Sequence, residues 1–133
     1  MLHGLLALCA ALAFSSAHAA DVVVFTDTQH PVNGARDAQV VLLDAASRVE
    51  ALLGAQLPAD PAQAEAVVRQ RLSQGGAGLQ KRLATAYQGV ADAWGTGVTG
   101  IPAVVVDGRY VVYGDPDVAR AVARIQAFRS ARP

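Results

Sequence analysis

Residues 98–114 constrain the fold most, because their order predicts a β-hairpin that is entered through a proline. Valines at 104–106 have the β-branched side chains that suit a pleated strand. The Asp107-Gly108 pair that follows is a strong signal for a two-residue hairpin turn, since both central residues of that turn need φ > 0. Pro102 falls at the first strand position, where a missing N–H is tolerated. The chain is therefore expected to build a sheet around this hairpin.

Periodicity elsewhere in the chain extends the hairpin into an α/β pattern. Two short β-branched runs predict two further strands, and helical spacing of apolar residues predicts four helices. Asp44 and Asp60 are expected N-caps, and the glycines within 75–78 break or at least weaken the middle helical region. One mixed sheet of about four strands, covered by helices, follows from this order. The expected strands are 21–26, 39–43, 103–106 and 110–113, and the expected helices are 45–53, 61–73, 79–94 and 117–128.

The apolar faces of these elements define one expected core. No linker or internal repeat divides the chain, so residues 20–133 are expected to form a single domain. Trp94 is expected either in that core or as an anchor at the end of its helix. The large residues expected to be buried are Val24, Val41, Leu43, Leu83, Val104, Val106, Val122 and Ile125.

The N-terminal segment has the pattern of a signal peptide. Every residue from Leu5 to Phe14 is apolar, a run of ten, and a membrane-spanning helix needs about 20. Ala17-His18-Ala19 is an A-x-A cleavage pattern, so residues 1–19 are expected to be removed by cleavage after Ala19. The formal net charge of zero gives no electrostatic argument for binding nucleic acid or an anionic membrane.

Two segments resemble parts of the thioredoxin fold. The order V-x-x-I-P, apolar strand, D-G resembles its second half, in which the proline before the strand is cis and faces the redox cysteines. Residues 24–32 resemble the V-x-F-[ST]-D-x-x-C-P-x-C stretch of periplasmic thioredoxin-like proteins, with His30 where the first cysteine would stand. Only Cys9, in the predicted leader, is a cysteine, and imidazole cannot replace a thiolate in disulfide exchange. The resemblance implies a thioredoxin-like α/β fold with Pro102 cis and with a helical insertion before the hairpin, but without redox chemistry.

A second resemblance covers nearly the whole chain after the leader. The leader together with residues 25–32 and 97–121 is similar to a family of small exported proteins that integrating conjugative elements of proteobacteria encode. A weaker resemblance is to the thioredoxin-like pilus-assembly proteins of F-type conjugation systems. These resemblances imply a periplasmic location and participation in conjugative DNA transfer beside a type IV secretion apparatus.

The leading hypothesis is a non-catalytic periplasmic module that binds another protein of the conjugation machinery or supports its assembly. No cofactor, no direct contact with nucleic acid and no membrane insertion after cleavage are expected. In a thioredoxin-like arrangement the loop over 26–32 and the Ile101-Pro102 peptide lie side by side at one edge. The candidate partner-binding residues are Asp27, Gln29, His30, Pro31, Ile101 and Pro102.

Two other functions stay open. The first is a thiol-disulfide oxidoreductase or isomerase, which the lack of cysteine in residues 20–133 opposes. The second is a periplasmic carrier of a small ligand or metal. His30 is the only histidine after the leader, so a metal site would lack a second His or Cys. The first reading of His30 is a turn residue that binds the local backbone, ahead of a partner contact or a metal ligand.

Overall fold

Strand β1 (Val22–Thr26) lies inside a four-stranded mixed sheet and is hydrogen-bonded on both sides. In this computed structural model, which describes residues 19–132, the strand order is β2-β1-β3-β4. β1 pairs in parallel with β2 and antiparallel with β3, and β3 pairs antiparallel with β4. The other elements are β2 (Gln39–Leu42), α1 (Ala45–Leu53), α2 (Pro61–Thr96), β3 (Ala103–Val106), β4 (Tyr110–Tyr113) and α3 (Val118–Ser130).

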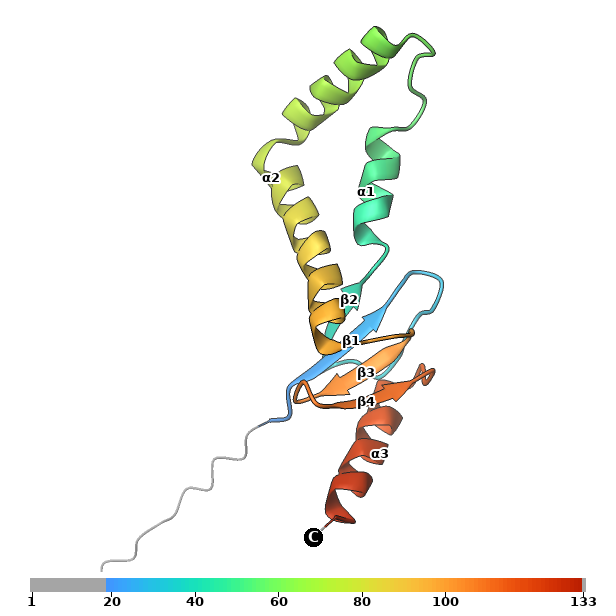
Figure 1. Cartoon of the computed structure of the whole chain (residues 1–133), viewed down its shortest axis with the longest axis vertical. Coiled ribbons are helices and arrows are strands. Elements are labelled where there is room, and N and C mark those ends of the chain that lie inside the picture. The colour runs from blue at the N-terminus through green and yellow to red at the C-terminus, as the bar shows by residue number, and fades with distance from the viewer. Residues whose placement is uncertain (1–18, 133) are drawn as a thin grey trace, which may run out of the picture.

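Side chains along β1 and β3 point alternately to the two faces of the sheet, and they form one apolar layer on each face. Val24 and Val104 face α3 and pack with Val118 and Ala121 of that helix. On the opposite face, Phe25 and Val105 are buried against Ala93 in the C-terminal half of α2. Their other neighbours are Ala103, Val41, Leu43 and Val98. Figure 1 shows α3 on one side of the sheet and α1 with α2 on the other. The fold is an α/β sheet covered on both faces, and it is compatible with a thioredoxin-like arrangement.

The connection between the parallel strands β1 and β2 contains no helix. Parallel neighbours need a crossover of a dozen or more residues, which is usually helical. Here residues 27–38 cross as an irregular segment that is tied to the start of α3. Asn33 N–H donates to Pro116 O over 2.8 Å, and Val118 N–H donates to Asn33 O over 3.0 Å. Val32, Ala35 and Ala38 of this segment then pack on the Val24 layer, where a crossover helix would otherwise cover the sheet.

Helices α1 and α2 form an arm that extends away from the sheet (Figure 1). α2 is kinked at Gly76, whose φ of 53° and ψ of −150° suit glycine and almost no other residue. The kink turns the N-terminal half of α2 back over the end of α1, where Arg71 Nη1 donates to the carbonyls of Leu53 (2.8 Å) and Ala55 (2.7 Å). This guanidinium satisfies carbonyls that the end of α1 leaves without partners, and so it ties the two helices together.

Most local expectations are confirmed. The hairpin strands have the predicted bounds, Asp107 and Gly108 adopt φ of 53° and 59°, and the Ile101-Pro102 peptide is cis. Asp60 caps α2 by accepting from Gln63 N–H over 2.9 Å. The predicted leader, residues 1–19, lies outside the described residues except for Ala19. Among the helices of residues 19–132, none is both long and apolar enough to cross a membrane.

The two helices predicted over 61–73 and 79–94 are confirmed as the two parts of α2, because Gly76 has a non-helical φ and ψ and divides them at a kink. Three expectations need correction. Trp94 is neither core nor anchor, since 82% of it is exposed. Asp44 precedes α1 but makes no side-chain cap, because its carboxylate bonds Thr28 instead. Half of the expected core is only half-buried, namely Val41, Leu43, Leu83 and Val122, whereas Val24, Val104, Val106 and Ile125 are buried.

Two glycines of α2 give a matched test of this packing. A Cβ at Gly89 would lie 2.6 Å from Val41 Cγ1, whereas a Cβ at Gly78 would meet nothing within 4 Å. Gly78→Ala should raise the free energy of unfolding by about 0.5–1 kcal/mol through helix propensity. Gly89→Ala should lower it by about 1–3 kcal/mol, because valine is stiff at χ1 and cannot easily give way. Urea unfolding measures both, and two stabilising substitutions would contradict the close approach of α2 to β2.

Candidate functional site

The structure brings the two predicted site segments to one end of the sheet. β1 and β3 are antiparallel, and Phe25 is paired with Ala103. The residues after β1, beginning at Asp27, therefore leave the sheet beside the residues that enter β3, Ile101 and Pro102. Gln29, His30 and Pro31 are exposed on the loop, Asp27 and Ile101 are half-buried, and Pro102 is buried. We call these two segments the β1-end surface.

Asp27 organises the loop of this surface. Its Oδ1 accepts from the backbone N–H groups of Gln29 (2.9 Å) and His30 (2.8 Å) and lies 2.7 Å from His30 Nδ1. The hydrogen bond with the His30 side chain is the main cause that holds the pKa of Asp27 below its ordinary value, and the two backbone bonds lower it further. Thr26 Oγ1 also donates to His30 O over 2.6 Å. The loop is thus held from both ends while 51% of the His30 side chain remains exposed.

Asp44 anchors the loop from the neighbouring parallel strand. Its Oδ2 accepts from the hydroxyl of Thr28 and, at 3.3 Å, from the Thr28 N–H. The hydroxyl bond is the main reason that the pKa of Asp44 lies below its ordinary value. Asp44 follows β2 as Asp27 follows β1, so the two carboxylates fix the loop at the carboxyl ends of the parallel pair.

The backbone at Ile101 is the open part of the β1-end surface. Pro102 O accepts from Gly114 N–H over 2.8 Å, so it is occupied by β4. Neither the N–H nor the C=O of Ile101 has a hydrogen-bond partner within residues 19–132. Tyr113 flanks this edge, because its hydroxyl accepts from Thr99 N–H over 3.4 Å while 43% of the residue is exposed. Tyr113 is not among the residues that the sequence predicts for this surface.

A buried carboxylate, Asp115, connects the segment after β4 to helix α3. Asp115, only 7% exposed, accepts from Arg120 Nε (2.9 Å), Arg120 Nη2 (2.6 Å) and Asp117 N–H (3.0 Å), and Arg124 lies 3.9 Å away. The Arg120 bonds are the largest cause that lowers the pKa of Asp115 to about 2. The one sequence signal for this cluster is the i, i+4 spacing of Arg120 and Arg124 on the following helix.

The chemistry that this arrangement offers is hydrogen bonding at a fixed edge. His30 and Asp27 form a pair at the surface, and within residues 19–132 no further ionisable side chain is hydrogen-bonded or ion-paired to either of them. Within the same residues no group of three or more His, Cys, Asp or Glu side chains is placed to hold a metal ion.

Residues 19–131 match the family described as "Protein of unknown function (DUF1525)". The chain belongs to the DUF1525 family. No curated protein and no solved structure matches it. The matched residues include every strand and helix of the DUF1525 domain and both segments of its β1-end surface.

The Asp115 cluster makes the stability of the DUF1525 domain depend on pH at the acid end. Because the folded pKa of about 2 lies below the ordinary 3.8, Asp115 stabilises the fold above about pH 4, and this contribution is lost as the pH falls toward 2. The difference in unfolding free energy between the parent and Asp115→Asn should therefore shrink between about pH 4 and 2. Asp37→Asn, at an exposed carboxylate with no partner in the described chain, is the matched control. A difference that stays constant over this range would contradict the Asp115–Arg120 pair.

Proposed function

We propose that this DUF1525 protein is an exported, non-catalytic, protein-binding component of a conjugative DNA-transfer apparatus. The conjugative context comes from the likeness of residues 25–32 and 97–121 to proteins of integrating conjugative elements, and that likeness also supports periplasmic export with cleavage after Ala19. The observation that carries the binding function is the unpaired main chain of Ile101 beside an exposed, braced loop.

An extended segment of a partner forms hydrogen bonds with the unpaired N–H and C=O of Ile101 by strand addition. Its backbone donates to and accepts from Ile101, and this main-chain pairing provides affinity with little dependence on sequence. Side chains that flank the edge then select the partner: His30 and Gln29 from the loop, and Tyr113 from β4. Since Asp27 and Asp44 already hold the loop in place, little conformational entropy is lost when the partner binds.

The residues of the surface support binding rather than catalysis. Residues 20–133 contain no cysteine, so thiol-disulfide exchange lacks its nucleophile there. The alternative oxidoreductase or isomerase activity has a direct test in the reduction of insulin by the exported protein, and catalysed turnover would favour it over our proposal.

A steric block at the edge tests the binding function. A Cβ at Gly100 would meet only Tyr113 Cδ1, at 3.9 Å, so Gly100→Gln leaves the fold intact and places a side chain beside Ile101. Gly95→Gln, at an exposed glycine whose Cβ would meet nothing within 4 Å, is the matched control. We expect Gly100→Gln to lower DNA transfer about tenfold or more, the change that a loss of roughly 1.4 kcal/mol in partner binding produces. The control variant should transfer DNA at the parental frequency.

Export and folding of both variants are checked by fractionation and circular dichroism before transfer is scored. Parental transfer by a folded, exported Gly100→Gln variant would place the binding surface elsewhere. If deletion of the whole gene leaves transfer unchanged, the conjugative context itself is wrong.

A further inference from the structure

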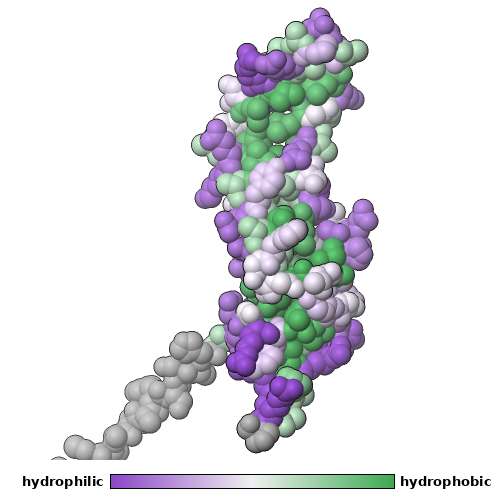
Figure 2. Space-filling view, viewed as in Figure 1, coloured by the Kyte–Doolittle hydropathy of each residue, from purple (hydrophilic) through white to green (hydrophobic). Residues whose placement is uncertain are grey.

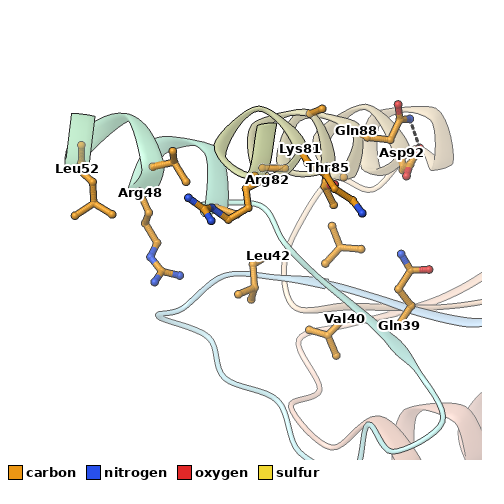
Figure 3. A pocket seen from close by; sticks show the side chains of 18 residues that line it. Gln39, Val40, Leu42, Arg48, Leu52, Lys81, Arg82, Thr85, Gln88 and Asp92 are labelled. Atoms are coloured by element: carbon orange, nitrogen blue, oxygen red, sulfur yellow. Dashed lines mark hydrogen bonds between the residues drawn. The ribbon is translucent and has the colours of Figure 1, made fainter. Parts of the chain in front are cut away.

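A second surface, remote from Ile101 in the sheet order, has the features of a peptide-binding groove. It lies between strand β2, helix α1 and the C-terminal half of α2, and its volume is about 1160 Å³ (Figure 3). β2 is the edge strand of the sheet, whereas Ile101 enters β3 on the other side of β1. We call this surface the β2 groove.

The backbone of β2 is open toward the groove. Leu43 N–H donates to Thr26 O of β1 over 2.8 Å. Main-chain groups of successive residues in a strand alternate between its two sides, so those of Val41 also point to β1. The N–H and C=O groups of Val40 and Leu42 therefore point outward, where the sheet has no further strand. An extended chain beside β2 would satisfy these groups.

The walls of the groove are apolar where such a chain would lie. Val40 is 41% exposed and Leu52 of α1 is 73% exposed, which leaves branched side chains in water on both the strand and the helix. Leu42 and Val49 line the same space. Figure 2 shows apolar surface that continues from the sheet into the helical arm between hydrophilic margins. Contiguous exposed apolar surface with a polar rim is typical of a protein-binding site.

The charged residues of the rim are mainly cationic. Arg48 of α1 and Lys81 and Arg82 of α2 line the groove, and none of them forms an ion pair with a residue in 19–132. Figure 3 shows the side chain of Arg48 extending from α1 toward the sheet. The lining carboxylate, Asp92, accepts from Gln88 over 2.8 Å.

Asp44, at the start of α1, feels the charge of Arg48, but its Oδ2 is already bonded to Thr28, which is the main cause of its lowered pKa. The rim is thus complementary to a ligand that carries negative charge.

We propose that the β2 groove binds an extended, acidic segment of a partner protein that adds a strand beside β2. Alternate side chains of a strand beside β2 point to opposite faces of the sheet. Carboxylates on the face of α1 and α2 meet the three cations, and apolar side chains between them pack beside Val40 and Leu42, which share the face of Val24 and Thr26. A free lipid or nucleotide has the charge but cannot pair with the outward groups of Val40 and Leu42. This inference is independent of the Ile101 edge, because it concerns the opposite side of β1 and its test requires no DNA transfer.

The test uses the exported chain and a blocked seven-residue peptide that alternates glutamate with valine. Two matched peptides carry lysine in place of glutamate, or N-methyl groups at alternate residues that remove the main-chain donors. Binding is followed by NMR of the backbone amides. The acidic peptide should bind, shift the amides of Val40 and Leu42, and lose affinity as salt is raised. The lysine and the N-methylated peptides should each bind at least about tenfold more weakly.

Charge reversal in the protein provides the second readout. Reversing the three groove cations should weaken the acidic peptide at least about tenfold, because each exposed pair contributes a fraction of a kcal/mol to about 1 kcal/mol. The matched control reverses three exposed arginines outside the groove, and it should leave the affinity unchanged within about twofold. The groove variant is Arg48→Glu, Lys81→Glu, Arg82→Glu, and the control is Arg36→Glu, Arg109→Glu, Arg132→Glu.

Each other outcome overturns the proposal. Equal binding of acidic and basic peptides removes the charge argument, and equal binding of the N-methylated peptide removes strand addition. Shifts at Ile101 without shifts at Val40 and Leu42 assign the peptide to the other edge. If dodecyl sulfate monomers occupy the groove and the acidic peptide does not, the groove is a small-molecule site. Self-association of the chain through β2 at the peptide's concentration would make a second copy the occupant.

Discussion

The pairing of β1 on both of its sides is the constraint on which the rest of the structure depends. Val24 is fully buried and is paired with Val40 on one side and with Val104 on the other. Alternation along β1 sends Val24 to the α3 layer and Phe25 to the α2 layer, so one five-residue strand connects both halves of the core. Slipping this strand by one residue would exchange the two layers, and for that reason the apolar pattern fixes the register.

The two candidate surfaces both follow from where this pairing stops. The loop that begins at Asp27 follows the carboxyl end of β1. Beside it lies Ile101, just before β3, whose main-chain groups have no hydrogen-bond partner in the described residues. β2 is the edge strand of the sheet, and α1 begins after only two further residues, Leu43 and Asp44. α2 approaches β2 closely at Gly89, where the missing side chain allows contact with Val41, and both residues line the groove.

Much of the fold was predictable from sequence because its signals are local. Asp107-Gly108 specifies its turn within two residues, and Asp60-Pro61 specifies a helix start in the same way. What failed depended on contacts between distant segments. The glycines within 75–78 predict the break that Gly76 makes in α2, but they do not predict that Arg71, before the break, bonds the carbonyl end of α1.

The sites show the same division between local and non-local signals. The sequence places Asp27 and His30 on one loop, but it does not reveal that Asp44 accepts a hydrogen bond from Thr28, 16 residues earlier in the chain. The outward backbone of β2 and the three cations beside it come together only through the packing of α1 on α2. Trp94 follows helical spacing like a core residue, but it lies on the face of α2 that no other element covers and stays 82% exposed.

Amide hydrogen exchange of the exported protein tests most directly whether the β1 pairing ends in an open edge. The amides of Val104 and Val24, inside the sheet, should exchange only with global unfolding, while the amide of Ile101 should exchange at nearly the rate of an unstructured peptide. Such a contrast between Ile101 and Val104, three positions apart in the chain, would show that Ile101 is free to receive a partner. If the Ile101 amide is as protected as that of Val104, another part of the chain already covers the edge, and the account of the β1-end surface is wrong.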